Sequence, residues 1–160
     1  MSDHIIVAPH ADDEIIGCHE VITNPDLKPI IIYTEDMDEE RKEETLTLRD
    51  HCELKVQLYL KQVPPNLLDP AMNNTYYFPH PIYETHPAHR LNGIVGESMA
   101  RNGFKVIFYS TEMNVPFKYE CRRPKGKLQL MNDVYPSQQS LWKHDHKYWL
   151  FSGYDRWVIL

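Results

Sequence analysis

The sequence predicts an α/β protein with a mainly parallel sheet. Four short apolar runs, at residues 4–8, 30–33, 56–60 and 104–109, alternate with segments that carry helical patterns. Apolar runs of about four to eight residues bounded by turn residues are typical of buried strands. Strands that alternate with helices favour a parallel sheet with helices packed on its faces. We therefore expect an α/β sandwich, and the length of 160 residues indicates a single domain, residues 1–160.

The first two helices are expected at residues 13–23 and at about residues 38–55. The first begins with acidic side chains, which suit the positive end of a helix, and it ends at Asn24-Pro25. On this helix we interpret Cys18 as a small core thiol and His19 as a surface imidazole. The second helix has only a weak apolar stripe, so most of its charges are expected to be solvated.

A third helix is expected at about residues 87–101, with Asn102-Gly103 as its C-cap. Its apolar residues recur at a helical spacing that predicts a core-facing stripe. These residues are Leu91, Ile94, Val95 and Met99.

The connection between residues 61 and 86 shows no clear helix or strand. It holds Asn73-Asn74 and five prolines, namely Pro64, Pro65, Pro70, Pro79 and Pro81. Its aromatic side chains are expected either to line a substrate pocket or to pack on the core; they are Tyr76, Tyr77, Phe78 and Tyr83. A long connection of this kind in a compact domain is usually functional or mobile.

The last quarter of the chain has a weaker pattern. We interpret residues 128–134 and 141–151 as helices, and residues 157–160 as an apolar tail that packs on the domain or pairs with a partner. The segment His144-Asp145-His146 is a second candidate metal cluster, because alternate residues of a strand share a face. The alternative is that this segment is a solvated part of a helix.

Composition narrows the class of protein. The three cysteines lack C-x-x-C spacing, which indicates neither a disulfide framework nor a structural zinc site. Without a secretory segment or a long apolar run, the chain is expected to be cytoplasmic and free of membrane spans. The net charge of -6 argues against a surface for duplex nucleic acid. The basic residues 118–127 form either a solvated loop or a clamp for an anionic substrate, such as a phosphorylated sugar or nucleotide.

A polar cluster follows directly on the first strand. It consists of His10 and the carboxylates Asp12, Asp13 and Glu14. Imidazole nitrogens and carboxylate oxygens are ligands for zinc, and a carboxylate that stays off the metal can serve as a general base. Sites in open α/β sheets form at the carboxyl ends of strands. The alternative is a polar turn in which Asp12 or Asp13 only caps the helix that follows.

Three segments of the chain can be compared with known motifs. They are residues 9–14, PHADDE, residues 86–90, HPAHR, and Lys127 with residues 135–138, YPSQ. The first matches the first motif of the GlcNAc-PI de-N-acetylase (PIG-L/LmbE-like) family, the second resembles its H-x-D-H motif, and the third resembles a weaker stretch of the family. The resemblance implies a Rossmann-like sandwich with a mainly parallel sheet. Because the family usually covers a longer chain, this would be a minimal version of the LmbE-like fold.

The resemblance also implies roles for individual residues. It places zinc on His10, Asp13 and His89, with Asp12 as the general base. His86 would stabilise the oxyanion or pass a proton, and Arg41 on the second helix would reach the substrate. One departure is Ala88, where the family has an aspartate that orients the neighbouring histidine. This departure bears on His86 more than on His89.

The function implied is a metal-dependent hydrolase that removes an N-acyl group, usually acetyl, from an amino-sugar or related conjugate. The partner would be a small N-acylated substrate. The same ligands accept several divalent ions, so Fe²⁺ is an alternative to Zn²⁺. Two other functions stay open: a metal-dependent phosphoesterase, and a non-catalytic protein that binds a metal or ligand on this scaffold.

Overall fold

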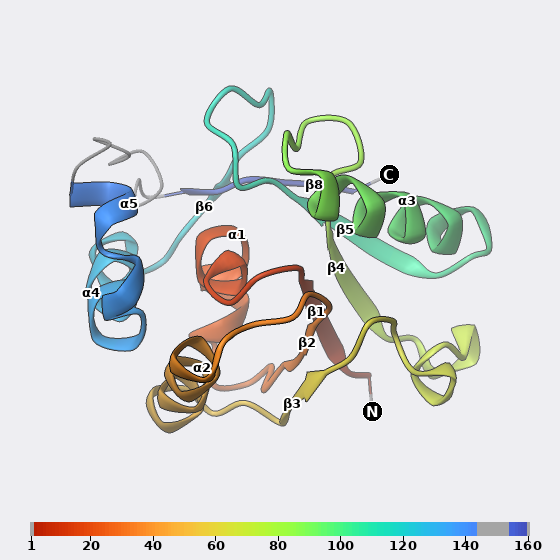
Figure 1. Cartoon of the computed structure of the whole chain (residues 1–160). Coiled ribbons are helices and arrows are strands. Elements are labelled where there is room, and N and C mark those ends of the chain that lie inside the picture. The colour runs from red at the N-terminus through yellow and green to blue at the C-terminus, as the bar shows by residue number, and fades with distance from the viewer. Residues whose placement is uncertain (1, 144–153, 160) are drawn as a thin grey trace.

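The structure is a computed structural model that describes residues 2–143 and 154–159. Its centre is a six-stranded sheet with the order β3-β2-β1-β4-β5-β8 (Figure 1). The strands are β1 (His4–Ala8), β2 (Ile30–Tyr33), β3 (Val56–Tyr59), β4 (Thr75–Pro79), β5 (Lys105–Tyr109) and β8 (Trp157–Ile159). All neighbouring pairs are parallel except β5 and β8, which are antiparallel. The predicted α/β fold with a mainly parallel sheet is therefore confirmed.

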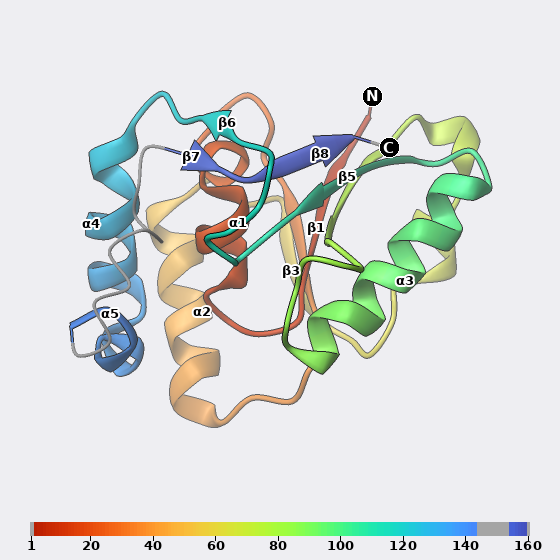
Figure 2. The same ribbon diagram turned by 90° about the horizontal axis from the view of Figure 1, so that it is seen from above.

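Helices cover both faces of the sheet (Figures 1 and 2). One face carries α1 (Asp13–Ile22), α2 (Glu39–His51), α4 (Pro124–Val134) and α5 (Ser140–Lys143). The other face carries α3 (Pro87–Arg101), which packs on β4 and β5. The remaining elements are the 3-10 turns η1 (Pro65–Leu67), η2 (Pro70–Met72) and η3 (Pro136–Gln138), and a small two-stranded antiparallel sheet of β6 (Tyr119–Glu120) and β7 (Tyr154–Asp155).

The alternation of side chains along the strands divides the core into two layers. Ile6 and Ala8 of β1 point towards α1, whereas Ile5 and Val7 point to the opposite face, where α3 lies. Every residue of α1 is buried, because this helix lies between the sheet and α4. The loop that follows β1 therefore starts from the middle of the sheet and leads into the most buried helix.

Two predictions about the middle of the chain were wrong. The proline-rich connection contains β4, whose aromatic residues Tyr76, Tyr77 and Phe78 are all buried in the core. The expected core-facing stripe of α3 points to solvent at Leu91, Ile94 and Val95, and only Met99 of that group is buried. The buried face of α3 includes Gly93 and Gly96, which allow the helix to approach β4 closely.

Further predictions can be compared with the described residues. His19 is 1% exposed, so its assignment to the surface was wrong, whereas Cys18 is in the core as expected. The predicted helix at residues 128–134 lies within α4. The apolar tail forms β8 and packs on the domain. His144 and His146, and most of the helix predicted for residues 141–151, lie outside the described residues.

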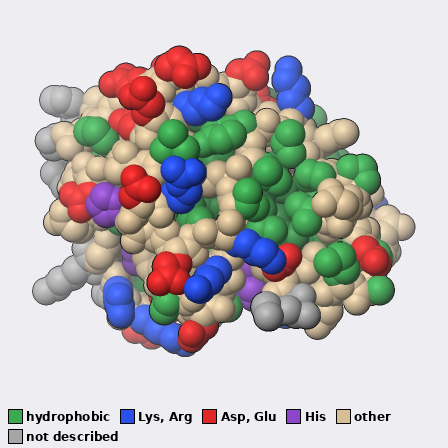
Figure 3. Space-filling view, turned by 90° about the horizontal axis from the view of Figure 1, so that it is seen from below, with side chains coloured by type: hydrophobic (Ala, Val, Ile, Leu, Met, Phe, Trp, Pro, Cys, Tyr) green, Lys and Arg blue, Asp and Glu red, His purple; other side chains and the backbone are tan. Residues whose placement is uncertain are grey.

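Two surface features bear on later sections. Seen from below, hydrophobic side chains gather over the part of the molecule that holds β3 and the loop after it (Figure 3). Val56, Tyr59 and Leu60 are exposed there. In residues 2–143 and 154–159, no helix has the length and apolar character needed to cross a membrane.

Candidate metal centre

The two histidine-bearing motifs meet at the carboxyl edge of the sheet. His10 follows β1, and His86 and His89 lie at the start of α3, after β4. Strands β1 and β4 are neighbours, but the chain leaves β1 towards β2 on one side and reaches β4 on the other. This is the point where the strand order reverses, which is where open α/β sheets form their binding sites.

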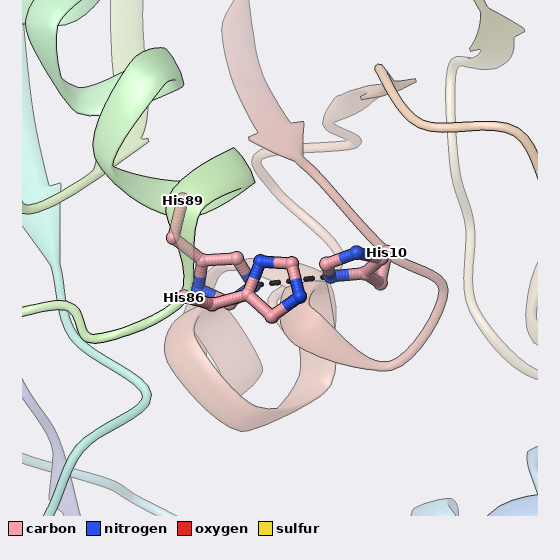
Figure 4. Close-up of side chains that lie close together, drawn as sticks. All are labelled: His10, His86 and His89. Carbon is pink, nitrogen blue, oxygen red and sulfur yellow. Dashed lines mark hydrogen bonds between the residues drawn. The ribbon is translucent and has the colours of Figure 1, made fainter.

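Three imidazole rings converge at this point (Figure 4). One ring nitrogen from each of His10, His86 and His89 lies within 4.8 Å of the others, so this group could hold a metal ion. Nδ1 of His10 is 3.1 Å from Nε2 of His89. Two ligands at about 2.0–2.1 Å from a tetrahedral zinc lie roughly 3.3 Å apart, which is close to this separation.

The carboxylate of Asp13 joins two of these rings. Its Oδ2 atom lies 3.0 Å from Nε2 of His89 and 3.3 Å from Nδ1 of His10. The same oxygen accepts a hydrogen bond of 2.8 Å from the backbone N–H of His10. The predicted ligands His10, Asp13 and His89 thus contribute one donor atom each, and the three distances between these atoms are 3.0–3.3 Å.

Charge is concentrated in this buried cluster. Burial acts to raise the pKa of Asp13, but the adjacent His89 and His10 rings outweigh it and hold the pKa well below its usual value. For His89, burial acts to lower the pKa, and the carboxylates of Asp13 and Glu84 raise it to about 10. A metal ion and a proton compete for the same ring nitrogen, so binding of a metal by His89 would release a proton.

His86 differs from the other two histidines because it is exposed at the mouth of the site. Its ring stands edge-on to that of His10, with 4.6 Å between the centroids. Its Nδ1 accepts a hydrogen bond from the backbone N–H of Ala88, which caps α3. Burial, followed by the charges of His10 and His89, lowers the pKa of His86. In the neutral ring Nδ1 is therefore the acceptor, and Nε2 carries the proton.

Asp12 is buried and has φ 114°, a backbone conformation that side-chain-bearing residues rarely adopt. It occupies the N-cap position of α1, but its side chain makes no capping hydrogen bond. Instead its Oδ2 accepts a hydrogen bond of 3.1 Å from Nη2 of Arg41, which also donates to the carbonyl of Ala11. Burial, and next the charge of Asp13, raise the pKa of Asp12.

The contacts of Arg41 with Asp12 bring this predicted substrate-binding residue to the edge of the site. Arg41 comes from α2, so one guanidinium connects α2 to the loop after β1. Its predicted role towards a substrate stays a prediction.

Glu14, for which the sequence analysis predicted no separate role, holds the backbone of Asp12. Its Oε2 accepts a hydrogen bond of 2.9 Å from the backbone N–H of Asp12. Its Oε1 accepts hydrogen bonds from the hydroxyls of Tyr33 and Tyr135. Burial raises the pKa of Glu14 to about 7. This buried network fixes the unusual backbone turn from which Asp12 and Asp13 project.

Glu84 is a second residue that the sequence did not single out. Its buried carboxylate lies 3.4 Å from Nδ1 of His89 and accepts hydrogen bonds from the N–H and hydroxyl of Thr111. A carboxylate on the outer nitrogen of a ligating histidine fixes the ring and its tautomer. Glu84 is therefore placed to give His89 this kind of support.

The third motif contributes to packing between helices in the described contacts. Nζ of the fully buried Lys127 contacts the carboxylate of Asp155 at 3.0 Å and the carbonyl of Ile16. The backbone N–H and hydroxyl of Ser137 both donate to the carboxylate of Glu44 on α2. These contacts tie α4 and η3 to α1 and α2.

Comparison with protein-family models, curated proteins and solved structures gave no match. The fold and the cluster define an α/β protein with a candidate metal centre at the switch point of its sheet. The resemblance to the LmbE-like family stays a prediction.

Proposed function

We propose that this chain is a metal-dependent amide hydrolase that removes an N-acyl group, with N-acetylated amino sugars as the first substrate class to examine. The observation that carries the proposal is the convergence of His10, Asp13 and His89 within 3.0–3.3 Å, with a further carboxylate, Asp12, adjacent in the chain. Two imidazoles and one carboxylate are a ligand set found in hydrolytic zinc sites that keep one position open for water.

In this proposal His10, Asp13 and His89 hold Zn²⁺, or Fe²⁺ as the alternative. The bound ion supplies Lewis acidity and lowers the pKa of water to about 7. Asp12 accepts the proton of the attacking water and later passes it to the departing amine. The raised pKa of Asp12 suits a group that must carry a proton during part of the cycle. Arg41 limits this rise and orients the carboxylate.

His86 has a distinct role at the mouth of the site. The hydrogen bond from Ala88 to Nδ1 leaves the Nε2–H of the neutral ring available to a substrate. This N–H donates to the carbonyl oxygen of the amide and stabilises the charge that develops on it. We therefore assign to His86 the neutral ring, with its Nε2–H as the donor.

The test combines metal content with activity. Elemental mass spectrometry should find about one zinc or iron per chain in the wild type, and a loss of metal in His10→Ala and His89→Ala. Asp12→Asn should retain metal and lose at least about 100-fold in the rate of amine release, as expected for loss of a general base. His51→Ala is the matched control, because His51 is an exposed histidine on α2. Metal-free wild type that resists loading would contradict the proposal.

A second function rests on His86. If His86 joins His10, His89 and Asp13 as a fourth ligand, the ion has a closed four-coordinate shell, which is typical of structural sites. The chain would then be a non-catalytic metal-binding protein. His86→Ala distinguishes the two cases: the hydrolase keeps its metal and loses activity, whereas the closed site loses metal affinity.

A further inference from the structure

Helix α3 exposes an apolar stripe on the side that faces away from the sheet. Leu91, Ile94 and Val95 are 65%, 55% and 49% exposed. Their spacing of three and four residues places them on one side of the helix. The stripe is separate from the candidate metal centre, which uses the first turn and the opposite side of α3. A regular apolar stripe on an exposed helix is the pattern with which helices pack against one another.

Charged side chains on α3 indicate what packs there. Arg90 and Glu97 are seven residues apart, so they lie on the same flank of the stripe, two turns from each other. If a second α3 runs antiparallel with its Ile94 near the first copy's Ile94, Arg90 of each copy lies beside the partner's Glu97. A parallel two-fold arrangement would instead put the flanks that carry Arg90 and Glu97 on opposite sides of the helix pair, so that Arg90 could not reach the partner's Glu97. The charges therefore match a second copy in the antiparallel direction.

The exposed edge of the sheet offers a poorer contact between copies. The apolar strand β3 is an edge strand, and Lys55 and Lys61 stand on either side of it. Antiparallel self-pairing centred on Leu58 would place Lys55 of one copy opposite the partner's Lys61. Flanking lysines are a common device against edge-to-edge pairing. This contrast favours α3 over the hydrophobic area around β3 as the surface for a second copy.

We propose that two copies of this chain associate through α3, as an antiparallel helix pair around a two-fold axis near Ile94. Leu91, Ile94 and Val95 form the apolar centre, and two Arg90–Glu97 ion pairs flank it. A two-fold contact uses the same patch on both copies, which this arrangement satisfies. The inference stands apart from the proposed hydrolase activity, because none of these side chains belongs to the metal centre.

Sedimentation velocity over a range of protein concentrations tests the association. The wild type should shift from monomer to dimer as concentration rises, and Ile94→Asp should weaken the dimer at least about tenfold. Leu46→Asp is the matched control, because Leu46 is an exposed leucine on α2, away from α3. Circular dichroism verifies that both variants fold. A wild type that stays monomeric throughout, or a dimer that Ile94→Asp leaves unchanged, overturns the proposal.

Charge reversal tests the antiparallel geometry. Arg90→Glu and Glu97→Arg should each weaken the dimer, and the double variant should restore it, because the reversed pairs match again in a two-fold contact. Glu97 also pairs with Arg101 of its own chain, so the thermal melt of each variant is the folding control. Ile94→Cys should form a disulfide-linked dimer under mild oxidation, and Leu46→Cys should not. Equal weakening in the double and single variants would overturn the Arg90–Glu97 pairing.

Discussion

The carboxylate of Glu84 lies 3.4 Å from Nδ1 of His89, on the side of the ring opposite Asp13. His89 is thus held between two carboxylates, one on each ring nitrogen. Glu84 is itself fixed by the backbone N–H and hydroxyl of Thr111. A carboxylate, a histidine and a metal in this order form a common support for a metal ligand. The second carboxylate that contacts His89 therefore comes from position 84, in the loop before α3, while position 88 holds alanine.

Glu84→Gln should weaken metal binding by about 10- to 100-fold, which is the usual effect of losing such an outer partner. Glutamine has nearly the same shape and can still accept hydrogen bonds from Thr111, so the fold should be retained. The affinity is measured by competition with a chromogenic chelator. Glu112→Gln serves as the control, because Glu112 accepts hydrogen bonds from Thr85 and has no contact with His89 among the hydrogen bonds described here. Equal affinities in all three proteins would show that Glu84 has no influence on the metal.

The buried His19 should make the fold sensitive to mild acid. Burial lowers the pKa of His19 to about 4, whereas an unfolded histidine titrates near 6.5. Between these pH values the unfolded chain binds a proton at His19 that the folded chain does not. The contribution of the neutral His19 to the free energy of unfolding is therefore fully present above about pH 6.5 and is lost as the pH decreases. From pH 7.5 to pH 5, His19 should reduce the free energy of unfolding by about 2 kcal/mol.

Urea unfolding at these two pH values measures the effect. His19→Gln should lose less stability than the wild type between pH 7.5 and 5, because it removes the titrating ring. His51→Gln should behave like the wild type, since His51 is exposed on α2. The same loss in His19→Gln as in the wild type would assign the acid sensitivity to other groups.

The close contact between α3 and β4 depends on Gly93. A Cβ atom added at this position would lie 2.6 Å from the carbonyl oxygen of Pro79 and from Cα of Pro81. Both are backbone atoms, which cannot move aside as a side chain can. Gly93→Ala should therefore reduce the free energy of unfolding by about 1–3 kcal/mol, even though alanine is the better helix former. Urea denaturation gives the value.

Gly126→Ala is the matched comparison for Gly93→Ala. Gly126 also lies in a helix, α4, but a Cβ atom there would have no neighbour closer than 3.8 Å. This variant should be as stable as the wild type or more stable by up to about 1 kcal/mol. Destabilisation of both variants by the same amount would mean that contact with β4 is not the cause.

The buried ion pair of Lys127 and Asp155 should be important for stability. Both side chains are 0% exposed, and Nζ is 3.0 Å from Oδ1. Lys127→Met leaves the carboxylate of Asp155 buried without its cation, which should reduce the free energy of unfolding by about 3–5 kcal/mol. Urea denaturation is the measurement, and Lys55→Met is the control because the side chain of Lys55, which pairs with Asp3, is 53% exposed. A decrease in the free energy of unfolding of less than about 1 kcal/mol would mean that this buried pair contributes no more than a surface ion pair.

The sequence allowed the position of the site to be predicted because β1 has a strong local pattern. A short run of buried apolar residues ends at Pro9, and the polar side chains that follow lie at the carboxyl edge of the sheet. The meeting of His10 with His89 was a prediction of the family resemblance. The structure brings their ring nitrogens to 3.1 Å. Local sequence patterns could not show that His10 and His89 lie together, because their proximity depends on the pairing of β1 with β4.

Strand β4 was not predicted because prolines lie close to it on both sides in the sequence. Prolines on both sides suggested an irregular connection, but Pro79 is the last residue of the strand, so its missing N–H falls at the end of the strand and not in its middle. The aromatic residues before it are good strand formers. The prolines of η1 and η2 belong to short turns that precede the strand.

The sequence pattern also could not show which side of α3 faces the sheet. Its apolar residues do form a stripe, but periodicity shows only that one side is apolar and not what that side contacts. The side with Ala88, Gly93 and Gly96 lies on the sheet because small residues permit the close approach. Glu84 gave no signal for a related reason: its partners, Ser110 and Thr111, lie about 26 residues further along the chain.

The distance in sequence between His10 and His89 determines when the candidate metal centre can form. Their ring nitrogens meet across 79 positions, and the strands that bring them together pair across about 70. A nascent chain therefore emerges with its histidines scattered, and a chelating pocket forms only after β4 and α3 have docked. Binding of a metal ion at this site would therefore require that the first two thirds of the chain have reached their native arrangement. In the cell, metal loading would accordingly be a late event in maturation, after synthesis has passed α3.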